Sequence, residues 1–174
     1  MSSAETQSGE DFGERLRAIA IAAGQIAAIC DDILEGPGRH AGVRLDKLAR
    51  DAVASAQVRY AGVIELASQP VVALARPGDI IRILCNILAN ACRAAGPVGR
   101  ISVLVEEEDG RARLSVTDSG GGLGRAAARR GAGLGLDIVG ALALKYGGSV
   151  RLGIGDLGGL AVTVELPAHW GSSN

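Results

Sequence analysis

Two asparagines in an apolar stretch, Asn86 and Asn90, have a spacing that could serve chemistry. They stand four residues apart, so in a helix both amides project from one face, and Arg93 lies three residues further on the same side. Amide groups in an apolar helix are costly unless they bond a partner. Their oxygens suit Mg²⁺, and the guanidinium suits a phosphate. Taken alone, however, the pattern favours solvent-facing or mutually bonded asparagines.

A carboxylate followed by glycines forms the second segment, DSGGGL at residues 118–123. It comes directly after a stretch of alternating apolar residues, which predicts a strand. A buried carboxylate at the end of a strand can accept a hydrogen bond from the exocyclic amine of a base. Glycines after Asp118 let the backbone approach a flat ring. The segment is therefore a candidate site for a nucleobase.

The third segment, GAGLGL at residues 131–136, opens a predicted helix. Glycines there allow backbone N–H groups to reach phosphates at the helix N-terminus. The segment is similar to the first half of a dinucleotide-binding fingerprint, but the later acidic residue and the strand–turn–helix context of that motif are missing. A glycine-rich turn of this kind is weak evidence by itself.

The elements that must position these residues alternate between helices and strands. Apolar periodicity marks the elements, and glycine and proline pairs mark their ends. Helices and antiparallel hairpins in this order predict an α+β fold, a two-layer α/β sandwich in which helices cover one face of a mixed β-sheet. The expected helices are 16–34, 43–56, 77–95 and 134–146, and the expected strands are 63–67, 71–75, 101–107, 111–117, 150–154 and 160–166.

The composition limits the possible binding partners and the cellular compartment of the protein. Of 174 residues, 48% are hydrophobic and only 2% are aromatic, so we expect a core of Ala, Val, Leu and Ile. The net charge of −1 and the scarcity of aromatic side chains exclude a nucleic-acid binder. No apolar run is long enough to span a membrane, and the odd number of cysteines, three, indicates a reducing, cytoplasmic location.

In order and spacing, the three segments resemble the N, G1 and G2 boxes of the GHKL ATP-binding superfamily. Within it, the sequence is most similar to the catalytic ATP-binding domain of bacterial sensor histidine kinases. The resemblance covers about residues 43–167 and includes Gly78-Asp79 before the N box and Tyr146-Gly147-Gly148 after the G2 box. It implies the GHKL fold, with ATP and Mg²⁺ as cofactors.

The resemblance also implies a role for each matching residue. Asn90 would be the Mg²⁺ ligand, Arg93 a phosphate contact, and Asp118 the acceptor for the adenine amino group. The remaining residues that it assigns to nucleotide binding are Gly120, Gly122, Leu123, Gly131, Gly133, Leu134, Gly135 and Leu136.

Asn86 bears on the type of reaction. In the hydrolytic members of the superfamily, this position carries a glutamate that activates water. An amide cannot act as a general base. The resemblance therefore implies a catalytic set of Asn86, Asn90 and Arg93 that favours transfer of the γ-phosphoryl group to a protein side chain over hydrolysis.

Two departures from the family pattern concern the nucleotide. The lid between the G1 and G2 boxes is short, residues 124–130, and has no aromatic side chain. Its arginines, among them Arg129 and Arg130, form either a solvated charge cluster or a clamp on the triphosphate. The last strand has Leu160 and Ala161 where threonines are usual, so a water-mediated contact to adenine is lost or moved to the backbone.

The N-terminal part predicts an association module. We expect a disordered tail over 1–13, a helix and linker over 14–42, the ATP-binding domain over 43–170 and a tail over 171–174. Heptad spacing over 16–34 resembles the second dimerisation helix of a histidine kinase and predicts a homodimer. Neither His40 nor His169 resembles a phosphoacceptor, so we expect another chain or a missing segment to supply that histidine.

These observations lead to one interpretation and two alternatives. The chain is interpreted as the ATP-binding catalytic domain of a two-component sensor histidine kinase, working with a response regulator or a histidine-bearing partner. One alternative is a serine protein kinase of the anti-sigma-factor type, against which the N-terminal heptad helix argues. The other is a non-catalytic adaptor, against which the intact boxes argue.

Overall fold

The computed structural model describes residues 42–122 and 133–168, apart from the side chains of Gly133 and Leu134. They fold as an α+β domain. The helices are α2 (Leu45–Gln57), α3 (Pro77–Ala95) and α5 (Gly133–Lys145). The strands are β1 (Gly42–Arg44), β2 (Val63–Ser68), β3 (Val72–Leu74), β4 (Arg100–Glu108), β5 (Arg111–Asp118), β6 (Ser149–Ile154) and β7 (Leu160–Pro167).

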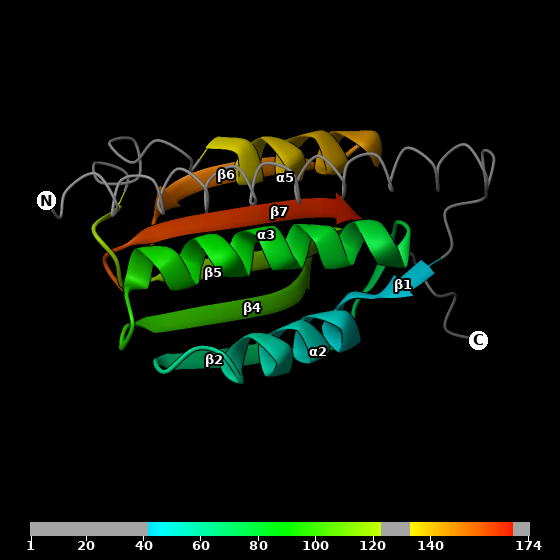
Figure 1. Cartoon of the computed structure of the whole chain (residues 1–174). Coiled ribbons are helices and arrows are strands. Elements are labelled where there is room, and N and C mark those ends of the chain that lie inside the picture. Colours follow the sequence, from blue (N-terminus) through cyan, green and yellow to red (C-terminus); the bar gives the residue numbers. More distant parts are fainter. Residues whose placement is uncertain (1–41, 123–132, 169–174) are drawn as a thin grey trace, which may run out of the picture. The chain divides into compact units, whose positions relative to one another are not determined.

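The main sheet is mixed and has five strands in the order β2-β4-β5-β7-β6. Strands β2 and β4 pair in parallel, and the other three pairs are antiparallel. A separate two-stranded sheet joins β1 to β3. The three helices lie over one face of the main sheet (Figure 1). The two-layer sandwich expected from the sequence is therefore confirmed.

The sheet follows from simple alternation of side chains. In β5, Ala112, Leu114 and Val116 are at most 2% exposed and point toward the helices, whereas the residues between them lie on the open face. Asp118 continues the buried phase of the strand and is 3% exposed. The alternation along β5 therefore places the Asp118 carboxylate on the face of the sheet that the helices cover.

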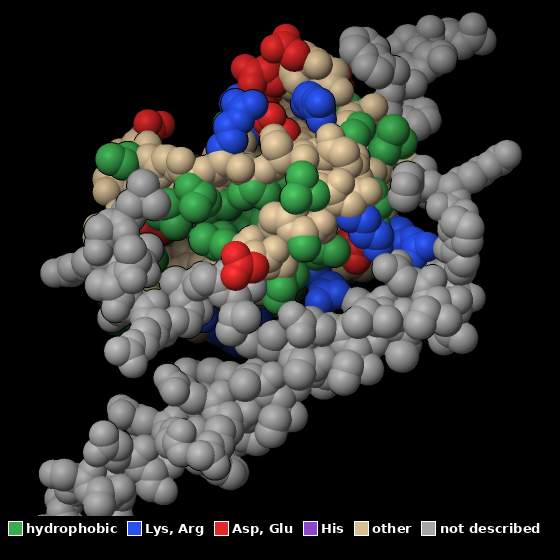
Figure 2. All heavy atoms as spheres, turned by 90° about the horizontal axis from the view of Figure 1, so that it is seen from above, with side chains coloured by type: hydrophobic (Ala, Val, Ile, Leu, Met, Phe, Trp, Pro, Cys, Tyr) green, Lys and Arg blue, Asp and Glu red, His purple; other side chains and the backbone are tan. Residues whose placement is uncertain are grey.

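Aliphatic side chains build the core, as the composition predicted. Isoleucine, leucine, valine and alanine account for all of its buried apolar residues within the described ranges except Tyr60 and Tyr146. Some apolar side chains stay at the surface, and Figure 2 shows several of them on the face that carries α5 and β6. Among the described side chains of these two elements, Leu144, Leu152 and Ile154 are the large exposed apolar ones.

One prediction about the secondary structure was wrong. The sequence predicted a helix from residue 43, but Gly42–Arg44 form a strand that pairs with β3, and the helix begins at Leu45. The Leu45 N–H donates to Val71 O at 2.9 Å, which holds the turn from β1 into α2 against β3. A pairing partner about thirty residues away cannot be predicted from local periodicity. The other boundaries agree to within one or two residues.

A buried carboxylate ties α3 to α5. Asp79, in the first turn of α3, accepts hydrogen bonds from the Tyr146 hydroxyl and from Lys145 Nζ, the latter at 3.1 Å. The Tyr146 oxygen accepts one from the Arg76 N–H at 3.3 Å. The C-terminal end of α5 therefore lies at the start of α3, so the two helices run antiparallel.

Several predictions fall outside the described residues. They concern the tail over 1–13, the heptad segment 16–34, the tail over 171–174, the short lid, and the two histidines, His40 and His169. Within the described residues, no helix is both long and apolar enough to cross a membrane.

Candidate functional site

The two asparagines of α3 have separate partners. Asn86 Nδ2 donates to the carbonyl of Arg82 at 2.8 Å, one turn earlier in the helix. Asn90 Oδ1 accepts from Arg93 Nη1 at 2.9 Å. The predicted common side of Asn90 and Arg93 is thereby confirmed, and the two amides are not bonded to each other.

Asn90 also holds an unsatisfied polar atom. Its Nδ2 is buried and has no hydrogen-bond partner among the residues that the structure describes. Leaving a buried amide donor unpaired costs about 1–3 kcal/mol, so such groups call for an explanation. Here the atom lies beside a glycine-rich helix start, where a polar ligand or ordered water can complete its bonding.

Gly135, in the first turn of α5, lies against both amides. A Cβ added at Gly135 would be 3.0 Å from Asn90 Nδ2 and 3.3 Å from Asn86 Oδ1. The sequence predicted this glycine on the phosphate side of a nucleotide, and the structure places it directly over the asparagine pair. Two segments that are 45 residues apart therefore form one polar site at the N-terminal end of α5.

Asp118 ends β5 as a buried carboxylate, as the sequence predicted. Its Oδ1 accepts the Gly120 N–H at 2.8 Å, and the Leu160 N–H bonds the same side chain. Burial raises the pKa of Asp118, while these two backbone bonds act in the opposite direction. A carboxylate held in this way is a directional hydrogen-bond acceptor in a poorly solvated place.

The glycines after Asp118 run between α3 and the β6–β7 hairpin. A Cβ at Gly120 would be 2.4 Å from the carbonyl oxygen of Ala94, which lies one turn beyond Asn90. Gly122 has a φ of +66°, and its Cβ position faces Gly158 O at 3.7 Å. The carboxylate and the asparagine pair therefore both lie near the C-terminal half of α3.

Not every predicted residue can be placed. Leu123, Arg129, Arg130 and Gly131 lie outside the described residues. Gly133 and Leu134 open α5, and Leu136 is partly buried against the core.

Gly159 and the bond between Asp79 and Tyr146 were not among the site features predicted from the sequence. The Gly158-Gly159 pair resembled the start of the family's usual final strand, but the contact of Gly159 with Asp118 depends on how the hairpin folds.

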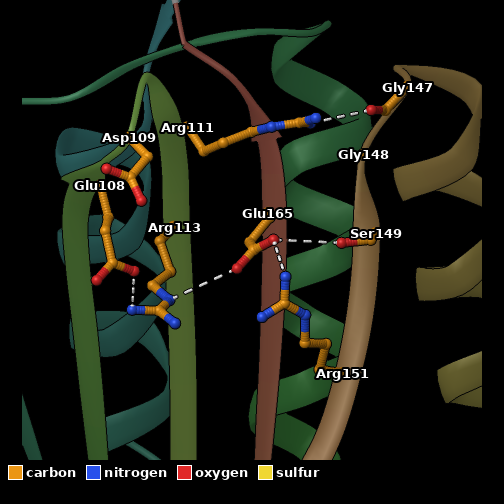
Figure 3. A pocket seen from close by; sticks show the side chains of 9 residues that line it. All are labelled: Glu108, Asp109, Arg111, Arg113, Gly147, Gly148, Ser149, Arg151 and Glu165. Carbon is orange, nitrogen blue, oxygen red and sulfur yellow. Dashed lines mark hydrogen bonds and ion pairs between the residues drawn. The ribbon is translucent and has the colours of Figure 1, made fainter.

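A hollow lies at the end of the main sheet opposite to Asp118. It has a volume of about 430 Å³, and its arginines already bond protein oxygens. Arg151 pairs with Glu165 at 2.9 Å, Arg113 pairs with Glu108, and Arg111 donates to Gly147 O at 3.1 Å (Figure 3). This hollow is therefore a poorer phosphate site than the start of α5. Its lining residues are Glu108, Asp109, Arg111, Arg113, Gly147, Gly148, Ser149, Arg151 and Glu165.

A helix-covered mixed sheet, a buried carboxylate at a strand end and an amide pair under a glycine-rich helix start define a GHKL-type ATPase domain. Accordingly, the family described as histidine kinase-, DNA gyrase B-, and HSP90-like ATPase matches residues 75–169. The chain belongs to this family, and ATP binding follows from that membership.

Two relatives indicate to which kind of protein within this family the chain is similar. The sensor protein kinase CarS of Pseudomonas aeruginosa is 37% identical over an alignment of 102 residues that covers 51% of this chain and 22% of CarS. The sensor histidine kinase ZraS of Escherichia coli is 30% identical over an alignment of 106 residues that covers 55% of this chain and 23% of ZraS. The chain thus spans less than a quarter of the length of these relatives. The domain is related to the catalytic domains of sensor histidine kinases.

A solved structure supports the same relationship. The mycobacterial sensor histidine kinase MprB superposes with a TM-score of 0.66 at 27% identity, covering 75% of this chain and 98% of that one. The expected histidine-kinase ATPase fold is therefore confirmed.

Proposed function

We propose that this chain binds Mg-ATP and transfers the γ-phosphoryl group to a histidine side chain supplied by another chain or segment. The observation that carries the proposal is the contact of Gly135 with Asn86 and Asn90. It brings an amide pair to a glycine-rich helix start, where backbone N–H groups and the helix dipole favour phosphate.

Asp118 supports the proposed binding position of the adenine base. Its carboxylate is 3% exposed and accepts hydrogen bonds from backbone donors on two sides. In the proposal, it accepts a further hydrogen bond from the 6-amino group of adenine. A buried acceptor left without its donor is penalised, which gives the site its preference for an amino-bearing base.

The residues present fit a magnesium ion. In the proposal the protein ligand is an amide oxygen, and the described residues hold no cluster of three or more His, Cys, Asp or Glu side chains that could hold a metal ion instead. Asn90 offers such an oxygen, its Oδ1, at the surface where Arg93 also lies. Mg²⁺ is commonly held by one or two protein oxygens together with phosphates and water. When bound, the ion would supply charge neutralisation at the phosphates.

Arg93 and Asn86 support transfer over hydrolysis. Arg93 carries an exposed positive charge beside Asn90, where it can approach a phosphate. Asn86 is an amide bonded to its own helix through Arg82, so it cannot accept a proton from water. In the proposed reaction, a nitrogen–phosphorus bond forms on the acceptor imidazole, and the bond from the γ-phosphorus to its bridging oxygen breaks to release ADP.

The proposal extends to partners. The acceptor histidine and a response regulator lie in other chains or segments, and residues 16–34 provide a homodimer contact. The domain division proposed for the chain places the catalytic unit at residues 43–170. The relatives are named as sensor kinases, which supports a role in two-component signalling.

Transfer in trans tests this function. The full chain is incubated with Mg²⁺ and γ-labelled ATP, with or without a separate histidine-kinase dimerisation domain. We expect acid-labile label on the added domain, no label on this chain, and no transfer to an added domain whose acceptor histidine is changed to alanine. Acid-stable label on a serine would favour the anti-sigma-type kinase instead, and ATP binding without transfer to any acceptor would favour the adaptor.

A further inference from the structure

The turn between β6 and β7 is a tight glycine-rich loop, residues 155–159. The Gly155 N–H donates to Gly159 O at 3.0 Å, and the Gly158 N–H donates to Gly155 O at 2.8 Å. Gly158 has a φ of +84°, a backbone conformation that side-chain-bearing residues rarely adopt. These bonds make the loop one compact unit, so a shift of Gly155 is transmitted to Gly159.

This loop lies directly on the end of β5. A Cβ at Gly159 would be 2.1 Å from the backbone oxygen of Asp118 and 2.3 Å from its Oδ1. A Cβ at Gly155 would be 2.1 Å from Thr117 Cγ2. Real Cβ atoms do not approach so closely, so each glycine is present where the loop backbone touches the strand.

The same contact fixes the Asp118 carboxylate from two sides. Gly120 donates to Oδ1 from the loop that follows β5, and Leu160 donates its N–H from the residue directly after Gly159. Gly159 itself is buried, so no solvent separates the loop from the carboxylate. A side chain at position 159 would push the carboxylate, the loop or both out of these bonds.

We infer that Gly159 is a positioning residue for base recognition, holding Asp118 in the one orientation that accepts the 6-amino group of a purine. The inference rests on the proposed function. It assigns the preference for a 6-aminopurine to the contact between Gly159 and Asp118, and not to Asp118 alone.

The test compares Mg-ATP with purine riboside 5′-triphosphate, which lacks the 6-amino group, by calorimetric titration of the full chain. A hydrogen bond to a charged group contributes about 1.5–3 kcal/mol, so the wild type should prefer ATP by roughly 10- to 100-fold. Gly159→Ala should lower the affinity for ATP by about tenfold or more and leave the analogue unchanged. Gly153→Ala, in the same hairpin but with open space at its Cβ position, should keep the preference.

Several results would overturn the inference. A folded Gly159→Ala variant that keeps the preference contradicts it, and so does an equal loss for both nucleotides, because that loss would reflect general damage to the site. If thermal unfolding shows that Gly159→Ala does not fold, Gly155→Ala decides in the same way, because the clash with Thr117 shifts the same loop.

The test also separates this inference from the proposed function. A preference that is lost in Asp118→Asn but kept in Gly159→Ala removes the role of Gly159 and leaves the base pocket standing. Equal affinity of the wild type for both nucleotides would contradict the recognition of the base by Asp118 itself.

Discussion

The hydroxyl of Tyr146 donates a hydrogen bond to Asp79 Oδ2, joining the residue that follows α5 to the first turn of α3. Lys145 Nζ reaches the same carboxylate oxygen at 3.1 Å. Because α3 and α5 are antiparallel, a bond at this end sets how the other end of α5 meets the asparagines. Asp79 and Tyr146 thus support, from a distance, the contact of Gly135 with Asn90.

Removal of this bond should destabilise the domain. Tyr146→Phe takes away one donor to a buried carboxylate and should lower the free energy of unfolding at pH 7 by about 1–2 kcal/mol. Urea denaturation of the wild type and of Tyr146→Phe measures this difference in the free energy of unfolding. An unchanged midpoint would show that Lys145 alone satisfies Asp79.

The same bond predicts a loss of stability in alkali. Burial, followed by the bond to Asp79, raises the pKa of Tyr146 to about 12, from 10.0. A raised pKa means that the contribution is complete below about pH 10 and is lost as the pH rises through about 12. The difference in stability between wild type and Tyr146→Phe should shrink over that window, and a constant difference would contradict the assignment.

Asp46 predicts a loss of stability in acid. Its carboxylate pairs with the Arg44 guanidinium through two bonds of 2.7 Å and accepts the Val71 N–H at 3.3 Å. The bonds from Arg44 are the main cause that lowers the pKa of Asp46 to about 2, from 3.8. A lowered pKa means that the contribution is present above about pH 4 and is lost as the pH falls through about 2.

Asp46→Asn tests this at both ends of the range. It should lower the free energy of unfolding at pH 7 by roughly 1–2 kcal/mol and make thermal stability less dependent on pH between 4 and 2. Asp51→Asn, at an exposed position of the same helix, is the matched control and should change little. Identical acid profiles for Asp46→Asn and wild type would contradict the prediction.

Periodicity predicted most of the fold, and the site only in part. Alternation along β5 put Asp118 in phase with the buried Val116, so its burial could be foreseen. The three-residue strand β1 could not, because it exists only through pairing with β3. The contacts of Gly135 with Asn90 and of Gly159 with Asp118 depend on how distant elements pack, which no local pattern contains.

Asn90→Ala should reduce the part of nucleotide binding that depends on the metal and spare the part that depends on the base. Loss of the amide oxygen should weaken ADP binding mainly when Mg²⁺ is present, while binding in excess EDTA should change little. Calorimetric titration of both proteins with and without Mg²⁺ measures the difference. Equal losses under the two conditions would argue against Asn90 as the ligand.

Asn86→Glu should increase the rate of ATP hydrolysis. A carboxylate at this position supplies the general base that the amide cannot, and general bases contribute about 10²–10⁴-fold to proton-transfer steps. We expect little hydrolysis by the wild type and a higher rate of phosphate release by the variant. Asn86→Gln is the control, since it lengthens the side chain without adding a base. Brisk hydrolysis by the wild type would show that another residue activates water.

Calorimetric titration of Mg-ATP into wild type and Asp118→Asn tests the central claim most directly. The amide retains one oxygen but presents a donor where a second acceptor stood, so affinity should fall at least about tenfold. Asp109→Asn, the same change in the β4–β5 turn at the other end of β5, should leave affinity unchanged. A wild type that binds Mg-ATP and an Asp118→Asn variant that binds it at least about tenfold more weakly would support the account. Equal affinities in the two proteins would contradict it.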